Sequence, residues 1–351
     1  MKNGLPRILV IRLSAIGDVV RVLPALHALR DAYPHAQIDW AVERKAADLL
    51  EAHLALDDLL VFERLEGWAG VKCFAAFCRR IRGRRYDIVV DFHGILKSGL
   101  IAGASGAKDR YGFARPRSQE GSYLFTNKKV RLFSHDLNRI EENLQLVDAL
   151  GAKRASLDVT IAIPPDVQEE VDAYFDATFD GGKWTVAMHP AMDRAEKRWP
   201  VEHFAELADL LLADGRFEVM LTWGPGQFDV IHAILDRVHR NVVVAPETQD
   251  LRQYAWLVHR AHLYFGGDTG PMHIASAMGT PVVAVFGGTD PAKHAPLRNP
   301  FEVLHIPPEG DTSDRARKAT AEERLRRITP EMAYDSCVRL LTQSAARPSA
   351  Q

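Results

Sequence analysis

Short apolar runs alternate with amphipathic stretches along most of this chain, and this alternation limits the folds that it can adopt. Each apolar run has the length of a buried strand, and each amphipathic stretch has the length of a helix. Such alternation is typical of β-α-β units, in which helices connect parallel strands and cover the sheet. The strands expected on this basis are 8–11, 38–42, 59–62 and 87–92 in the first half, and 184–190, 217–224, 242–245, 263–268 and 281–288 in the second.

The pattern changes where Pro164 and Pro165 follow each other, a pair that we expect to stop a helix and to mark an interdomain linker. We therefore predict two domains, 1–163 and 164–328, followed by a helix and tail, 329–351, that pack back on the first domain. A chain of 351 residues is long enough for two such cores. The predicted fold class is α/β, with two doubly wound parallel sheets that face each other across a cleft and bind ligands beyond the carboxyl ends of their strands.

Composition narrows the class of protein further. The net charge of −2 argues against bulk affinity for nucleic acid. The three cysteines contain no C-x-x-C pair, so neither a disulfide framework nor a zinc site is expected. No apolar run approaches the roughly 20 residues of a membrane-spanning helix, and the N-terminal run is interrupted by Arg12 and Asp18. We expect a cytoplasmic protein.

The most informative stretch of the second half is "YFGGDTGPMHIASAMGTPVVAVFG", 264–287. A strand ends there, Asp268-Thr269-Gly270 form a turn, and a proline follows at the position that proline favours at the start of a helix. The unpaired N–H groups of a helix N-terminus form an anion site, and phosphate is its usual guest. Thr269 and His273 can add hydrogen bonds. The alternative is plain helix capping by Asp268 or Thr269, with nothing bound.

The loop "HPAMDRAEKRWPVEHF", 189–204, leaves a strand at the same edge of the same predicted sheet. Lys197 in this loop can serve as a point charge for phosphate. A solvated loop is the alternative. Because both loops lie at one edge, they can converge on a single diphosphate.

The first half carries no G-x-G-x-x-G fingerprint after its first strand, since "SAIGDV" offers only Gly17. Asp18 stands instead at the start of the following helix. An acid there either interacts favourably with the helix dipole or acts as a general base, and both interpretations stay open. His93 and Lys97 in "DFHGILKSG", 91–99, are expected at the same edge.

Two basic segments complete the first half. Residues 103–135 are expected to form a long irregular loop that binds an anionic partner through residues such as Arg115 and Arg117, or else a solvated basic loop. The basic run at 79–85 is either a charged helix end in water or a contact with an anionic membrane face.

The segments "RLSAIGDVVRVLPALHALR", "DFHGILKSG", "EKRWPVEHF" and "GGDTGPMHIASAMGTPVVAVFGGTDP" together resemble the lipopolysaccharide heptosyltransferases of glycosyltransferase family 9, over nearly the whole chain. "IDWAVE" and "DFHGILKS" are more similar to type I than to type II. The resemblance implies a GT-B fold and inverting transfer of L-glycero-D-manno-heptose from ADP-heptose to a Kdo residue of the inner core. It implies a Kdo-lipid A type acceptor, peripheral contact with the inner membrane face, and no essential metal or redox cofactor.

The resemblance also implies roles for individual residues. Asp18 matches the catalytic base, and Lys197 matches the lysine that contacts the donor phosphates and the leaving group. Thr248 falls where family members contact the adenine. The donor-binding turn is matched by Asp268, Thr269, Gly270 and His273, and Asp268 is expected to face the hydroxyls of the heptose.

Two features depart from the family pattern. The 189 loop lacks the hydroxyl residues of the nearest family members and is one residue longer, and Phe228 stands where a glutamate usually meets the ribose, unless Gln227 or Asp229 substitutes. Other readings therefore remain: a family 9 transferase with another acceptor or donor, a GT-B sugar-nucleotide epimerase, or a two-lobed binding protein.

Overall fold

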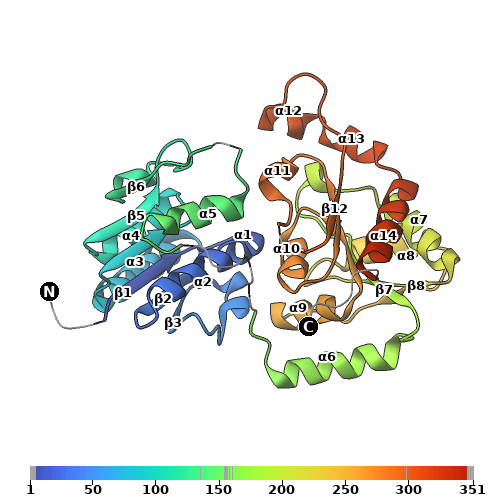
Figure 1. The fold of residues 1–351 in the computed structure, drawn as a ribbon, viewed down its shortest axis with the longest axis horizontal. Coiled ribbons are helices and arrows are strands. Elements are labelled where there is room, and N and C mark those ends of the chain that lie inside the picture. Colours follow the sequence, from blue (N-terminus) through green and yellow to red (C-terminus); the bar gives the residue numbers. More distant parts are fainter. Residues whose placement is uncertain are drawn as a thin grey trace. The chain divides into compact units, whose positions relative to one another are not determined.

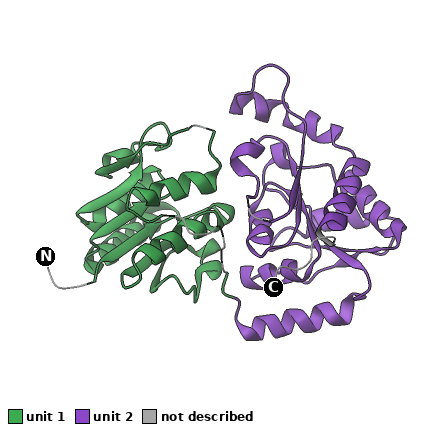
Figure 2. Cartoon of the chain, in the orientation of Figure 1, with its two compact units in different colours: residues 1–162 green, residues 163–351 purple. Residues whose placement is uncertain are grey.

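The structure is a computed structural model that describes residues 5–345 apart from 135, 154–156, 158, 160 and 298. The chain forms two compact units, residues 1–162 and 163–351 (Figure 2). The division falls beside the expected linker. However, Pro165 does not stop a helix: α6 (Pro165–Thr178) begins with it, because a proline in the first turn lacks only an N–H that has no helical partner.

Unit 1 contains a six-stranded sheet in the order β3-β2-β1-β4-β5-β6, and every pair of neighbours is parallel. Its elements, most of which Figure 1 labels, are β1 (Arg7–Ile11), α1 (Ile16–Val20), α2 (Leu23–Ala32), β2 (Gln37–Glu43), η1 (Arg44–Ala46), η2 (Asp48–Leu50), β3 (Asp58–Phe62), α3 (Gly67–Arg84), β4 (Ile88–Asp91), α4 (Leu96–Ser105), β5 (Asp109–Phe113), η3 (Ser122–Leu124), β6 (Lys128–Val130) and α5 (Arg139–Asp148).

Both faces of this sheet are covered. Leu9 and Ile11 of β1 belong to one core cluster with Phe77 of α3 and Ile101 of α4. Successive side chains of a strand point to opposite faces, so the fully buried Ile8 faces the other layer. There α2 packs against α5. A central strand buried on both faces explains why "ILVI" is apolar at every position.

Unit 2 repeats the topology, with parallel strands in the order β12-β11-β10-β7-β8-β9. Besides α6, its elements are β7 (Trp184–His189), η4 (Ala195–Lys197), α7 (Val201–Asp214), β8 (Phe217–Leu221), α8 (Phe228–Leu235), β9 (Val243–Val244), α9 (Leu251–Arg260), β10 (Leu263–Gly267), α10 (Gly270–Ala277), β11 (Val282–Phe286), α11 (Pro291–His294), β12 (Phe301–His305), α12 (Asp314–Ala319), α13 (Ala321–Arg327) and α14 (Pro330–Ala345).

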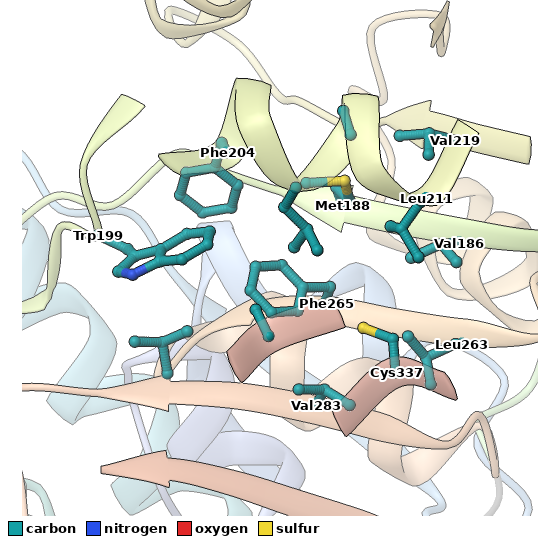
Figure 3. Close-up of a cluster of buried hydrophobic side chains, with 14 of the residues drawn as sticks. Val186, Met188, Trp199, Phe204, Leu211, Val219, Leu263, Phe265, Val283 and Cys337 are labelled. Atoms are coloured by element: carbon teal, nitrogen blue, oxygen red, sulfur yellow. The ribbon is translucent and has the colours of Figure 1, made fainter. Parts of the chain in front are cut away.

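The core of unit 2 is aromatic near the start of α7. The ring of Trp199 lies 4.9 Å from that of Phe204 and 5.3 Å from that of Phe265, between ring centroids (Figure 3). The indole N–H of Trp199 donates to the carbonyl of Ile328 at 2.9 Å. This bond fixes the end of α13 to the core.

The final helix packs elsewhere than the sequence led us to expect. Cys337 and Leu340 of α14 belong to the core cluster of unit 2, where Figure 3 shows Cys337 beside Leu263, and α14 packs against α7 and β12. We had expected this helix to pack back on the first domain. Its apolar stripe instead covers one face of the second sheet, which supplies a large apolar surface nearby in the chain. None of the described helices combines the length and apolar character needed to cross a bilayer.

The burial of α14 has a chemical consequence for its thiol. Cys337 is fully buried, and burial raises the pKa of its thiol, whereas Cys73 and Cys78 are partly exposed. Because only the thiolate reacts, we expect a thiol reagent such as Ellman's to label Cys337 only after denaturant is added. The mass of tryptic peptides after native labelling measures this, and native labelling of Cys337 would contradict the packing of α14.

Candidate functional site

Asp18 lies in the first helical turn after β1, where the sequence placed it. Each of its carboxylate oxygens forms an ion pair, one with Arg12 and the other with Arg21. The Asp18 side chain is 29% exposed, while both arginine side chains are 8% exposed. Two cations that are more deeply buried than Asp18 therefore orient its carboxylate. A favourable interaction with the helix dipole alone would not need these two partners.

Arg12 is itself fixed by the sheet. Its Nη1 donates to the carbonyl of Phe92 at 3.1 Å, and its own carbonyl accepts the indole N–H of Trp40 at 3.0 Å. Burial lowers the pKa of Arg12 to about 10, although Asp18 opposes this shift. The guanidinium therefore stays charged at neutral pH. The sequence analysis singled out neither arginine, but the i, i+3 spacing of Asp18 and Arg21 on one helix was an available signal.

His93 reaches the same turn from β4. Its Nδ1 accepts the backbone N–H of Leu13 at 3.4 Å. The buried carboxylate of Asp91 orders this loop by accepting the N–H groups of His93 and Gly94, at 3.0 and 3.1 Å, and the hydroxyl of Ser98 at 2.9 Å. Burial of the imidazole, and next the positive charge of Arg12, lowers the pKa of His93 to about 3. The imidazole is therefore neutral.

Two further predicted cations border this region. Lys97 donates from Nζ to Glu43 Oε1 at 3.1 Å and lies 5.4 Å from the ring centroid of Phe62. Arg117 donates from Nε to Glu142 Oε2 at 2.7 Å, and its guanidinium would stand 3.7 Å from a Cβ on Gly94. Arg117 therefore lies beside the turn that carries the neutral histidine.

The segment 103–135 is not the irregular loop that we predicted. It contains the end of α4, strands β5 and β6, and η3 between them. Arg110 holds the connection between these two parallel strands in place by donating to the carbonyls of Phe125 and Ala107. Arg115 lies over the ring of Tyr123, 5.0 Å from its centroid, and no described contact links it to Asp18. The prediction failed because β6 is a short, charged edge strand and β5 beside it lacks an apolar run.

In unit 2, Lys197 and Asp268 meet. Lys197 Nζ donates to the backbone carbonyl of Asp268 at 2.6 Å and to its Oδ2 at 2.8 Å. The other carboxylate oxygen lies 3.5 Å from Nε2 of His273. Burial alone would raise the pKa of Asp268, but the hydrogen bond from His273 and the charge of Lys197 hold it well below its usual range. The carboxylate of Asp268 is therefore ionised. Lys197, Asp268 and His273, which the sequence predicted for one site, lie together.

The turn of Asp268 leads into α10, whose N-terminus is not capped by a side chain. Thr269 occupies the N-cap position without a capping hydrogen bond, and its hydroxyl lies 3.4 Å from the carbonyl of Gly267. Pro271 stands within the first turn, as predicted. The capping alternative is therefore wrong for both candidates: Asp268 bonds Lys197 instead. The first-turn N–H groups remain available to an anion.

Glycines at the ends of β10 and β11 allow the loop that contains Lys197 to pack closely against these strands. A Cβ on Gly267 would stand 2.5 Å from Met192 Cε, and one on Gly287 would stand 2.5 Å from the carbonyl of Glu196. That carbonyl also accepts the N–H of Gly288 at 2.8 Å. The loop that contains Lys197 is thereby fixed to the carboxyl ends of β10 and β11.

Thr248 lies near the carboxyl ends of β8 and β9, and its hydroxyl donates to the carbonyl of Trp223 at 3.0 Å. The ring of Phe228 lies 4.9 Å from that of Trp223, between centroids. Gln227 turns back, so that its Oε1 accepts the N–H of Gly224 at 2.9 Å. An aromatic pair therefore stands beside the loop of Thr248.

His189, at the end of β7, faces the core of unit 2. Its Nδ1 lies 3.1 Å from the hydroxyl of Thr222, and burial lowers its pKa to about 4. The folded state thus favours the neutral imidazole, whereas an unfolded histidine titrates near 6.5. The contribution of His189 to stability is fully present above pH 6.5 and is lost as pH falls towards 4.

We therefore expect the urea midpoint of unfolding to fall between pH 7 and pH 5, and His189→Asn to reduce this fall. Asparagine retains a polar atom near the position of Nδ1 but does not titrate. His232→Asn, at an exposed position on α8, is the matched control. An equal pH dependence in wild type and His189→Asn would contradict the assignment.

The site residues share one topological origin. In each sheet the strand order reverses between two neighbouring central strands, β1 and β4 in unit 1, and β10 and β7 in unit 2. Asp18 and His93 follow the first pair, and Lys197 and Asp268 follow the second. Ligands of doubly wound sheets bind at such switch points.

Comparison with known proteins identifies the family and the fold. Residues 74–338 match the model of glycosyltransferase family 9 (heptosyltransferase). The chain is 24% identical over 300 residues to the lipopolysaccharide core heptosyltransferase OpsX of Haemophilus influenzae, covering 85% of this chain and 83% of that protein. It is 28% identical over 294 residues to lipopolysaccharide heptosyltransferase 1 of Escherichia coli K12, covering 81% and 89%.

The fold is similar to that of a solved structure, the ADP-heptose lipopolysaccharide heptosyltransferase II of E. coli. The TM-score is 0.77 at 21% identity, and the match covers 97% of this chain and 100% of that one. This likeness shows the GT-B fold. Since the family model spans well over half of the chain, the chain belongs to glycosyltransferase family 9, the heptosyltransferases, and is a glycosyltransferase.

Proposed function

We propose that this enzyme transfers L-glycero-D-manno-heptose from ADP-heptose to a Kdo residue of the lipopolysaccharide inner core, with inversion at the anomeric carbon. The acceptor is of the Kdo-lipid A type, and the enzyme acts at the cytoplasmic face of the membrane. Unit 2 holds the donor and unit 1 supplies the base and the acceptor site. The similarity to heptosyltransferases that act on lipopolysaccharide supports the substrate class.

The observation that carries the proposal is the position of Lys197 beside the uncapped N-terminus of α10. An ammonium group and several free N–H donors at one point suit a diphosphate. Thr269 and Gly270 border the same point, and His273 bonds the carboxylate of Asp268. We assign Asp268 to the heptose hydroxyls, because a carboxylate is a hydrogen-bond acceptor and repels phosphate.

The nucleoside is assigned to the edge of the same sheet. Thr248 is placed near the adenine, with backbone groups of its loop as partners. The ring pair of Trp223 and Phe228 offers an apolar surface beside it. An aromatic side chain provides no acceptor for the ribose hydroxyls, so we expect the ribose to be bound by backbone groups or by contact with the ring.

The acceptor site is assigned to the turn of Asp18. A Kdo acceptor is anionic, and the charges of Lys97 and Arg117 act on His93 beside this turn, whereas Arg115 lies over the ring of Tyr123. The cluster of Asp18, Arg12 and Arg21 has a net positive charge, because two cations pair with one anion. An acceptor carboxylate is thereby attracted to the base that must accept its hydroxyl proton.

The reaction that we propose is a single displacement. Asp18 accepts the proton of an acceptor hydroxyl as that oxygen forms a bond to the anomeric carbon. The bond from the anomeric carbon to the phosphate oxygen breaks, and ADP leaves with the electron pair. Lys197 and the first turn of α10 stabilise the negative charge that grows on the leaving diphosphate.

Calorimetry with ADP, UDP, GDP and NAD tests the donor assignment first, followed by a transfer assay with ADP-heptose and a Kdo-bearing acceptor. We expect ADP to bind more tightly than the others and the product to carry the inverted linkage. Preference for UDP or GDP would replace the heptose donor. Transfer only to an acceptor that already bears a heptose would indicate a type II activity, and donor turnover without acceptor would indicate an epimerase.

A further inference from the structure

Large apolar side chains that face water gather on one layer of unit 1. Of the twelve such exposed side chains among the described residues, six lie on α3 and the segment before it, on α4 and on η3. Helix α3 packs along α4, and α4 packs along η3. These six side chains, which we call the apolar patch, are Leu65, Trp68, Val71, Leu96, Leu100 and Leu124. Single exposed apolar residues are ordinary, but a gathering of them marks an interaction surface.

Trp68 is the most telling member of the apolar patch. Its side chain is 81% exposed, and the other five tryptophans of the chain are buried or partly buried. Val71 follows one helical turn later and is 58% exposed. Tryptophan combines a large apolar surface with a polar N–H, and for this reason it is enriched at the boundary between water and lipid.

Helix α3 carries charge of only one sign. Its 18 residues include one lysine and four arginines and contain no acid, in a chain with more acidic than basic residues. At the helical repeat, the exposed Trp68, Lys72, Arg79 and Arg82 lie on one face, and the buried Phe77 lies opposite. The outward face is therefore apolar at its start and cationic along the rest of its length.

Of the acids near this face, Glu66 is exposed at the start of α3, and two others have partners elsewhere. Glu63 forms an ion pair with Arg44 at 2.9 Å, and Glu120 accepts the N–H of Leu96 at 3.2 Å. Among the arginines of α3, Arg84 bonds an aspartate of β3 at 2.6 Å. The remaining basic side chains of the helix are exposed.

The apolar start of α3 lies at the edge of the sheet that carries the candidate acceptor site. Strand β3 ends at Phe62, and its ring lies 5.8 Å from that of Phe74 on α3, between centroids. Lys97 Nζ also lies over the Phe62 ring, 5.4 Å from its centroid. Trp68 precedes Phe74 and therefore stands near the carboxyl end of β3, the edge at which Asp18 also lies.

We propose that α3, α4 and η3 form the surface by which this enzyme docks on an anionic phospholipid bilayer. The apolar patch enters the headgroup boundary, and the basic residues of α3 contact the lipid phosphates. Apolar insertion and cationic attraction together give stable, reversible binding of an amphipathic helix. The inference rests on the proposed function in one respect, that the acceptor is carried by a membrane lipid, and it adds the surface that brings the acceptor site to it.

Vesicle sedimentation tests this directly, with phosphatidylcholine vesicles that contain or lack phosphatidylglycerol. We expect binding only to the anionic vesicles, a loss of binding at high salt, and a blue shift of tryptophan emission that Trp68→Phe removes. Trp68→Ser with Val71→Ser, and separately Arg79→Glu with Arg82→Glu, should each weaken binding at least about tenfold. No binding to anionic vesicles at low salt would overturn the proposal.

Matched controls separate docking from general surface chemistry. Leu54→Ser removes a side chain that is 90% exposed in the loop before β3, at the opposite edge of the sheet. Arg237→Glu reverses an exposed charge in unit 2. Both should bind vesicles like wild type. Equal weakening by these controls, or a concentration-dependent dimer that Trp68→Ser abolishes in the absence of lipid, would assign the patch to another role and overturn the proposal.

These measurements contain neither donor nor acceptor, so docking and transfer can fail separately. Trp68→Ser with Val71→Ser should transfer sugar to a water-soluble, delipidated acceptor at the wild-type rate. It should lose transfer to the same acceptor embedded in anionic vesicles. Vesicle binding without transfer from any nucleotide sugar would refute the proposed function alone, and equal transfer by wild type and variant in vesicles would refute the docking surface.

Discussion

Replacing Asp18 by asparagine should lower the rate of glycosyl transfer by about a hundredfold to ten thousandfold, the usual contribution of a positioned general base. The amide has almost the same shape and can still contact Arg12 and Arg21, but it cannot accept the proton of the acceptor hydroxyl. The donor site that we propose lies in the other unit, so the affinity for ADP should be unchanged. Steady-state kinetics and ADP calorimetry on the same preparation measure both quantities.

The asparagine also removes the counter-ion of two buried arginines, and this loss needs its own control. Asp57→Asn breaks a comparable ion pair with Arg30 in the same unit, where the distance is 2.6 Å. It should leave transfer unchanged while it lowers the thermal midpoint. Unimpaired turnover by Asp18→Asn, or an equal loss of activity in Asp57→Asn, would remove Asp18 from the role of base.

Replacing Lys197 by alanine should lower kcat by roughly tenfold to 150-fold, since one charge-assisted hydrogen bond contributes about 1.5–3 kcal/mol. The affinity for ADP should also fall, because in the proposed site the ammonium contacts the diphosphate in the ground state as well as in the transition state. Lys183→Ala is the matched control. That lysine directly precedes β7, at the opposite edge of the sheet. A variant at Lys197 that loses neither rate nor ADP affinity would sink the assignment of the leaving-group contact.

The elements that were predictable share a strong local signal. The apolar runs of β1 and β10 are buried on both faces of their sheets, and burial on both faces leaves no polar positions to obscure the pattern. The turn of Asp268 was predictable because glycine, proline and a strand end stand together at fixed spacing. Asp18 was singled out because an acid stands where such a turn usually carries glycines.

The features that were missed depend on partners far away in the chain. Arg12 can form its ion pair with Asp18 because hydrogen bonds to Phe92 and from Trp40, which are distant in the sequence, hold it in place. Strands β5 and β6 are formed by backbone pairing with their neighbours in the sheet, and they contain little apolar sequence of their own. The destination of α14 was wrong because an amphipathic stripe specifies that a helix is covered but not by which surface.

The two units repeat one strand order, and each closes its own hydrophobic core. The groups assigned to the sugar donor all belong to one unit, and the groups assigned to the acceptor all belong to the other. Recombination of two family members at the junction between residues 162 and 163 would therefore cut through neither core. Such chimeras can inherit the donor from one parent and the acceptor from the other, so evolution can change either substrate while the rest of the enzyme stays intact.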